Sequence, residues 1–121
     1  MGRRDGRPAG YVYILHFRTP LASGKKQSSH YVGWSRHWQW RIRQHREGRG
    51  ARIVEVAIAR GIVIEVATVA TVVSINGVQY HGRAAERAIK RQHHAARYCP
   101  LCGGHRAVDY RLDYQGAAHA Q

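Results

Sequence analysis

The longest apolar stretch of the chain, residues 62–75, limits the fold more than any other feature of the sequence. It is dense in Val, Ile and Thr, which favour strands, and Glu65 is its single charged residue. The stretch is too short to cross a bilayer, so we expect no membrane span. Residues 62–73 are therefore predicted to form a buried strand in a soluble protein of one domain.

A hairpin is predicted ahead of this strand. Residues 11–15 and 30–34 are rich in β-branched and aromatic side chains, which is typical of strands. Residues 19–29 between them are rich in Gly, Ser, Lys and Pro, and we expect them to form a longish basic turn. The two strands should therefore pair antiparallel.

Three helices are expected from the spacing of apolar residues and from end signals. Ser35 is the predicted N-cap of the first helix, which ends at the glycines of residues 48–50. Residues 51–60 are predicted to form a short helix and residues 83–97 a longer one. The inward stripe of the last helix, with Glu86 at its edge, is expected to be Ala85, Ala88, Ile89, Gln92 and Ala96.

The expected fold is α+β, with element order β-β-α-α-β-α and a small central three-stranded antiparallel sheet flanked by helices. Asn76-Gly77 is a strong turn signal, and the chain from Gln115 onward is expected to fray. Three parts are predicted: a flexible basic arm over residues 1–9, a folded domain over residues 10–98, and a Cys-x-x-Cys tail over residues 99–121.

The charge of the chain is strongly positive, since 20 Lys and Arg against 7 Asp and Glu give a formal net charge of +13. Such an excess favours a polyanionic partner, because each phosphate that a protein neutralises releases counterions. Charge alone does not separate DNA from RNA, or an enzyme from a ribosomal or architectural binder. No signal peptide is visible, so we expect a cytoplasmic, nucleoid-associated protein with no membrane partner.

Among the acidic residues, Glu86 is the best placed to hold a hard cation. It lies on a well-defined helix beside an apolar stripe, whereas the others lie in the arm, the tail, the apolar strand or less defined segments. No two acids have a spacing that would hold two metal ions. A metal-dependent nuclease built on this sequence would use one ion, and cationic side chains would supply the remaining charge stabilisation.

Four other side chains could complete such a site. Arg41 and His45 lie one helical turn apart on one face, and an arginine there could bind a phosphate bidentately. Tyr13 and Tyr31 lie near the middle of the paired strands, and a phenol beside a metal-bound water can accept or relay a proton. The alternative is ordinary packing, with a cross-strand tyrosine pair and an i, i+4 ion pair of Glu86.

The order of these residues resembles the GIY-YIG nuclease family. Residues 11–13 (YVY) and 31–33 (YVG) are similar to its two signature tripeptides, and residues 41–45 (RIRQH) are similar to its first-helix pattern. Residues 48–52 (GRGAR) resemble the segment after that helix in small stand-alone members, and residues 86–90 (ERAIK) resemble the metal-binding helix. Each motif is weak alone, whereas the ordered set is specific.

The resemblance implies an endonuclease that hydrolyses DNA, duplex or branched, with Mg²⁺ or Mn²⁺ on Glu86. It implies that Tyr13 activates the water and that Tyr31 orients the water or the phosphate. It also implies that Arg41 stabilises the pentacoordinate phosphate, with His45 assisting it or the proton relay. Which tyrosine is the base stays open.

The chain departs from the family pattern in two places. Tyr11 stands where the first motif has glycine, and two histidines, residues 93–94, stand where the family often has an asparagine near the site. The family includes repair, mobile-element and restriction enzymes, most of which gain specificity from an added domain. This chain has little room for one, so it recognises DNA structure, is weakly specific, or relies on a protein partner or a homodimer.

A zinc site is a further hypothesis for the tail. Cys99 and Cys102 form a Cys-x-x-Cys, which supplies two of the four ligands that zinc needs. His94 and His105 are the candidates for the other two, although their spacing is not a standard one. The alternative is a pair of reduced thiols that cap the last helix.

Nucleic-acid contacts are expected from exposed basic and aromatic side chains. Trp40 should point away from the core and could stack on a base, whereas Trp38 should pack with Ile42. The candidate contacts are Arg36, Trp40, Arg43, Lys90, Lys25 and Lys26, with the arm residues Arg3 and Arg4 suited to phosphate. A basic binding module that does not cut would need only these groups.

Overall fold

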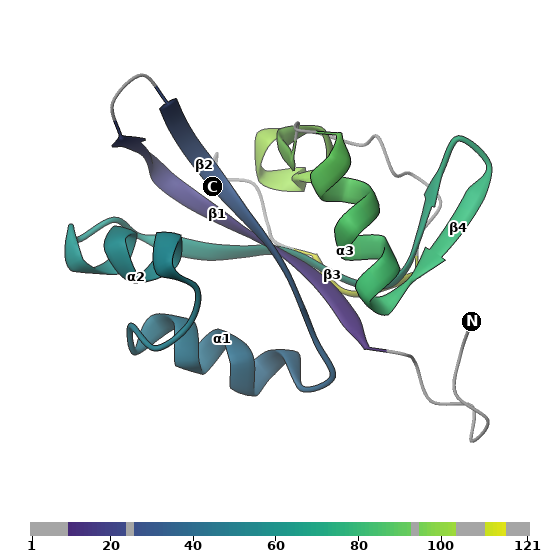
Figure 1. The fold of residues 1–121 in the computed structure, drawn as a ribbon, viewed down its shortest axis with the longest axis horizontal. Helices are drawn as coiled ribbons and strands as arrows, with labels where there is room; N and C mark the ends of the chain where they lie inside the picture. Colours follow the sequence, from purple (N-terminus) through teal and green to yellow (C-terminus); the bar gives the residue numbers. More distant parts are fainter. Residues whose placement is uncertain (1–9, 24–25, 93–94, 104–110, 116–121) are drawn as a thin grey trace.

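The structure is a computed structural model that describes residues 10–23, 26–92, 95–103 and 111–115, with only the backbone of residues 23, 26 and 111–115. The described residues form an antiparallel five-stranded sheet of order β2-β1-β3-β4, with β5 paired to β3 (Figure 1). The strands are β1 (Tyr11–Ser23), β2 (Lys26–Ser35), β3 (Ile64–Ile75), β4 (Val78–His81) and β5 (Arg111–Gln115).

The first hairpin is longer than predicted, so the expected turn over residues 19–29 is wrong. Both strands continue to the pair Ser23↔Lys26, past an irregularity between His16 and Leu21. Leu21 is buried in the core, and this anchors the end of β1 where local composition suggested a loop. The long hairpin also sets the pairs Tyr13↔Gly33 and His16↔His30 on which both sites below depend.

The sheet has more strands than the three predicted. Asn76 and Gly77 form the expected turn, both with positive φ (53° and 79°), and the chain returns at once as β4. The strand β4 was not predicted because its four residues are too few to show a pattern, and β5 in the tail was not predicted either. The observed strand and helix order is β-β-α-α-β-β-α-β.

Three α-helices pack on the sheet: α1 (Trp38–Arg46), α2 (Arg52–Ala59) and α3 (Gly82–Arg91). Ser35 does not cap α1 as predicted, because its Oγ accepts a hydrogen bond from the His37 N–H (3.0 Å) and His37 holds the N-cap position. The third helix ends at Arg91 instead of residue 97. Two short 3-10 helices follow, η1 (Ala95–Tyr98) and η2 (Pro100–Cys102).

The predicted inward stripe is therefore correct only within α3. Ala85, Ala88 and Ile89 are buried, whereas Gln92 and Ala96 lie beyond the helix and are exposed. Glu86 is half-buried at the edge of the stripe, as expected.

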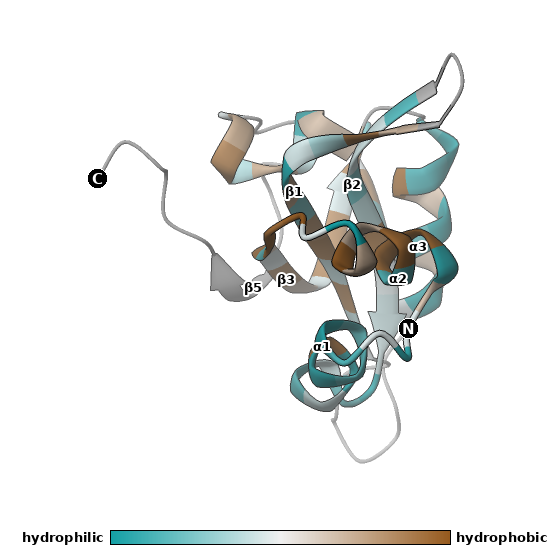
Figure 2. Ribbon diagram, turned by 90° about the vertical axis from the view of Figure 1, so that its left-hand side faces the viewer, coloured by the Kyte–Doolittle hydropathy of each residue, from teal (hydrophilic) through white to brown (hydrophobic). Residues whose placement is uncertain are grey.

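Each face of the sheet has its own core. On one face, Tyr13, Leu15 and Phe17 of β1 pack with residues of α1 and α2, and on the other Val12 and Ile14 pack with α3 and the 3-10 segment. Figure 1 shows α1 and α2 on one side of the sheet and α3 on the other. In Figure 2, α2 is coloured mostly hydrophobic and α1 mostly hydrophilic. No described helix is long and apolar enough to cross a membrane.

Candidate functional site

A buried hydrogen bond joins Tyr13 of β1 to His45 of α1. Both side chains are about 1% exposed, and the Tyr13 hydroxyl oxygen lies 2.8 Å from His45 Nε2. Two glycines make room for them. A Cβ added at Gly33 would overlap the Tyr13 hydroxyl, and one added at Gly50 would overlap the His45 ring. The backbone at Gly33 and Gly50 therefore packs directly against this pair.

The second nitrogen of His45 decides the direction of that hydrogen bond. The backbone N–H of Ala51 donates to His45 Nδ1 at 3.4 Å, so Nδ1 is an acceptor. Burial, and then the charge of Arg41, lower the pKa of His45 to about 4, so the ring is neutral near pH 7. A neutral ring with an accepting Nδ1 carries its proton on Nε2, which donates to the Tyr13 oxygen. The proton of Tyr13 is then available to another partner.

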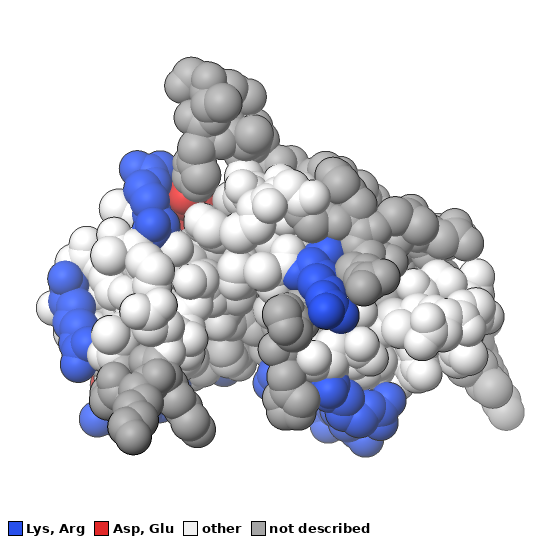
Figure 3. Space-filling view, turned by 90° about the horizontal axis from the view of Figure 1, so that it is seen from above, with Lys and Arg blue, Asp and Glu red and all other residues white. Residues whose placement is uncertain are grey.

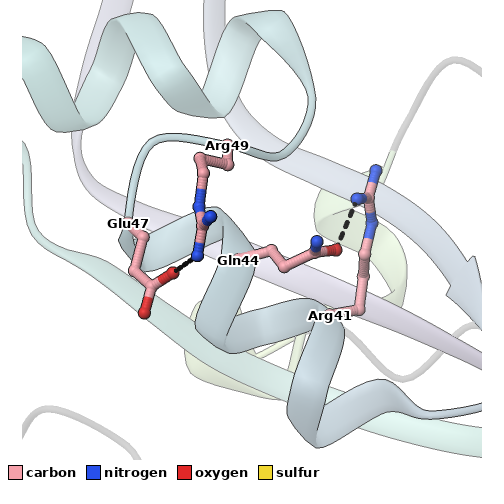
Figure 4. A network of polar contacts seen from close by, with 4 residues as sticks. All are labelled: Arg41, Gln44, Glu47 and Arg49. Atoms are coloured by element: carbon pink, nitrogen blue, oxygen red, sulfur yellow. Dashed lines mark hydrogen bonds and ion pairs between the residues drawn. The ribbon is translucent and has the colours of Figure 1, made fainter.

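Tyr31 and Arg41 complete what we call the tyrosine cluster: Tyr13, Tyr31, Arg41 and His45. The Tyr31 ring centroid lies 6.4 Å from that of Tyr13 and 5.3 Å from that of His45. The two tyrosines are diagonal neighbours, because Tyr13 pairs with Gly33 and Tyr31 with Leu15. Arg41 is half-buried, and its Nη1 donates to Gln44 Oε1 at 3.0 Å (Figure 4). The same close-up shows the Arg49–Glu47 ion pair at the end of α1.

The pKa of Tyr13 is raised well above its usual value. Burial is the main cause, followed by the neighbouring Tyr31; a hydrogen bond and the charge of Arg41 oppose it, and the charge of Glu86 adds a smaller increase. Tyr13 therefore holds its proton at neutral pH. Arg41 is the group that favours the phenolate.

Glu86 approaches the cluster from the other face of the sheet. Its helix packs on the face opposite Tyr13, and β2, which carries Tyr31, is the end strand of the sheet order. Lys90 Nζ lies 5.5 Å from the Tyr31 ring centroid and donates to Glu86 Oε2 at 3.1 Å. The structure thus brings four predicted site residues together, with Glu86 linked through Lys90 and through its effect on the pKa of Tyr13.

A second group, which we call the cysteine cluster, consists of His16, His30, Cys99 and Cys102. Each offers one ligand atom, and these atoms lie within 4.8 Å of one another, close enough for one metal ion. The predicted partners His94 and His105 lie outside the described residues. His16 and His30 were not predicted as ligands, and they become neighbours because they pair across the first hairpin. The available signal was that one histidine precedes the predicted turn and another follows it.

The predicted nucleic-acid contacts fall into two groups. Arg36, Trp40 and Arg43 line one open hollow at α1, and Trp40 is 56% exposed, as expected. Lys90 lies apart from them, at Tyr31. Residues 1–9, Lys25 and the Lys26 side chain lie outside what the structure describes. On the face seen in Figure 3, Lys and Arg occupy several patches and acidic atoms are sparse.

The chain matches no model of a protein family, no curated protein and no solved structure. Its candidate sites therefore rest on its own residues. They consist of the tyrosine cluster with Glu86 at the edge of the sheet, and of the cysteine cluster on the opposite face.

Proposed function

We propose that the chain is a metal-dependent endonuclease that hydrolyses DNA phosphodiester bonds. The observation that carries the proposal is the buried hydrogen bond between Tyr13 and His45. Both groups have pKa values shifted by burial and by Arg41, and titratable groups perturbed in this way cluster at functional sites. The half-buried Arg41 beside it and the net charge of +13 support a phosphate ligand. The ordered resemblance to GIY-YIG nucleases gives the reaction class.

The side chains of the cluster divide the work as follows. Arg41 donates to the non-bridging oxygens of the phosphate and stabilises the charge that accumulates as water attacks phosphorus. Tyr13 orients the attacking water and accepts its proton on the phenol oxygen as its own hydroxyl proton passes to solvent, and the leaving oxygen of the cleaved bond takes up a proton from solvent. The Nε2–H of His45 donates to the Tyr13 oxygen and supports any negative charge there. Tyr31, beside both rings, positions the phosphate or the water.

Glu86 would supply one carboxylate to a divalent cation, and waters and the phosphate would supply the other ligands. Mg²⁺ and Mn²⁺ prefer oxygen ligands, and Mg²⁺ commonly binds through one or two carboxylates with several waters retained. Glu86 is 18% exposed and is not part of the one group of three or more His, Cys, Asp or Glu ligands found among the described residues. Bound there, the cation would act as a Lewis acid on the phosphate and on water. Lys90 would have to give up its ion pair with Glu86 for this.

Nicking of supercoiled plasmid in Mg²⁺ or Mn²⁺ tests the proposal. We expect Glu86→Gln, which keeps the size of the side chain, to abolish nicking, and Glu47→Gln at the exposed end of α1 to cut like wild type. Intact plasmid with the wild-type protein, or equal nicking by wild type and Glu86→Gln, would reject an active site at Glu86. Nicked duplex, flap, four-way junction and single strand should be tested as alternative substrates.

A basic nucleic-acid-binding module is the second candidate. Glu86 is already paired with Lys90, and Tyr13 keeps its proton at neutral pH. Both observations favour this candidate, because a module that only binds nucleic acid needs neither a bound cation nor a general base. It predicts salt-sensitive DNA binding by the wild type without cutting in any divalent metal, and the same binding by Glu86→Gln.

A further inference from the structure

The cysteine cluster joins three segments that are distant in sequence. His16 and His30 face each other across β1 and β2, and Cys99 and Cys102 come from the 3-10 segment that follows α3. Cys99 is fully buried in the core of this face, the two histidines are half-buried, and Cys102 is exposed. This segment, light green in Figure 1, lies on the same side of the sheet as α3.

Four of the six distances between the ligand atoms are close to those of a tetrahedral zinc site, and the other two are at most 4.8 Å. With Zn–N of about 2.0 Å and Zn–S of about 2.3 Å, the edges of a tetrahedron are about 3.3 Å between nitrogens and about 3.5 Å between nitrogen and sulfur. His16 Nδ1 lies 3.2 Å from His30 Nε2. The nitrogen–sulfur distances are 3.5 Å and 3.7 Å from His16 Nδ1 to Cys102 and Cys99, and 3.3 Å from His30 Nε2 to Cys102.

Hydrogen bonding alone explains this arrangement poorly. His16 Nδ1 has three of the other ligand atoms within 3.7 Å, yet a ring nitrogen carries either one proton or one lone pair. Atoms that crowd around a common point in this way are typical of a metal site. We propose that His16, His30, Cys99 and Cys102 bind one zinc ion.

Zinc is the ion that this ligand set selects. Two thiolates with two imidazoles in a tetrahedron are a common structural zinc site, whereas Mg²⁺ and Mn²⁺ prefer oxygen. Four protein ligands leave no open position for substrate, so the role is structural. The ion ties the 3-10 segment after α3 to the first hairpin and so steadies the helix that carries Glu86. The inference does not depend on the nuclease proposal.

The metal content of the full-length chain, purified under reducing conditions, is the direct test. We expect about one zinc per chain, and replacement by Co²⁺ to give the intense visible bands of a tetrahedral site with sulfur-to-cobalt charge transfer. Removal of zinc with a chelator should lower the unfolding temperature by roughly 10 °C or more. None of these readouts requires activity.

Single substitutions locate the ion. Cys102→Ser and His30→Ala should each reduce the zinc content severalfold and change the cobalt spectrum, whereas His37→Ala, at an exposed histidine outside the cluster, should leave both as in wild type. Cys102 is exposed, so its replacement disturbs the core less than that of Cys99.

Three results would overturn the proposal. The first is reduced protein without zinc that binds Co²⁺ only in the weakly absorbing octahedral form. The second is a Cys99–Cys102 disulfide that resists mild reduction. The third is a zinc content that is unchanged in both cluster variants but is lost on substitution of His94 or His105, which would assign the ion to the tail.

Discussion

The tyrosine cluster and the cysteine cluster are built on the same two strands. Tyr31 and His30 are consecutive residues of β2, and because side chains alternate along a strand they point to opposite faces of the sheet. One face groups two phenols, an imidazole and a guanidinium, and the other groups two thiols and two imidazoles. The first hairpin thus contributes residues to two clusters on opposite faces, and the two clusters share no side chain.

The two clusters also differ in what completes them. The tyrosine cluster is made mostly by elements next to each other in the sequence, the first hairpin and α1, and Glu86 joins it only at the edge of the sheet. The cysteine cluster needs the hairpin and a segment from the other end of the folded region. Substitutions should therefore separate a catalytic effect from a structural one.

Tyr13→Phe should produce the largest difference between the effect on nicking and the effect on zinc content. Nicking is expected to fall about 100-fold, because the proton relay is lost, and the buried His45 Nε2–H loses its acceptor, which costs about 1–3 kcal/mol of stability. The zinc content should not change. Plasmid nicking rates, urea unfolding and metal analysis measure the three effects. A variant that cuts like wild type would remove Tyr13 from the mechanism.

Gly33→Ala should disturb the same cluster without removing a functional group. The new Cβ would overlap the Tyr13 hydroxyl and ring, so the phenol must shift, at a cost of about 1–3 kcal/mol. Nicking should fall more than zinc content, which urea unfolding, plasmid assays and metal analysis would show. Ser28→Ala on the same strand is the control. Wild-type stability of Gly33→Ala would mean that the cluster is loosely packed.

Acid should weaken the tyrosine cluster through His45. Its pKa is about 4 in the folded protein against 6.5 for an unperturbed histidine, because of burial and Arg41. Between these values the unfolded chain binds a proton that the native state does not, so stability falls by about 2.5 kcal/mol as the pH drops from 6.5 to 4.

The measurement is the free energy of unfolding in urea across this pH range. His45→Gln should flatten part of the slope. His30 shares the direction of the shift, so some slope should remain in His45→Gln. Equal slopes in His45→Gln and the wild type would show that folding does not lower the pKa of His45.

Trp40→Ala should have the smallest effect, and it should change only the affinity for DNA. The side chain is 56% exposed beside Arg36 and Arg43, and loss of one stacked base should weaken binding about 10-fold. Fluorescence anisotropy with labelled single-stranded and duplex DNA measures this. Val78→Ala, at another exposed apolar side chain, should bind as wild type does. If both variants lose affinity equally, the hollow at α1 is not a specific contact.

The local parts of the fold were predictable from the sequence. The first hairpin, α2 and the Asn76-Gly77 turn follow from β-branched runs, helical spacing and turn chemistry, which act between near neighbours. The ends of elements were not predictable, because Leu21 extends β1 by burial and the last helix ends six residues early. The short strands β4 and β5 exist because β3 offers them an edge to pair with.

The sequence by itself determined the residue types of the tyrosine cluster and their order along the chain. Only the tertiary structure decided that Tyr13 and His45 share a buried hydrogen bond, and that Glu86 approaches them around β2 rather than across a common face. It also decided the partners of Cys99 and Cys102. Periodicity in a sequence reports which face of an element is apolar, whereas the pairing of distant side chains depends on strand register and on packing between layers.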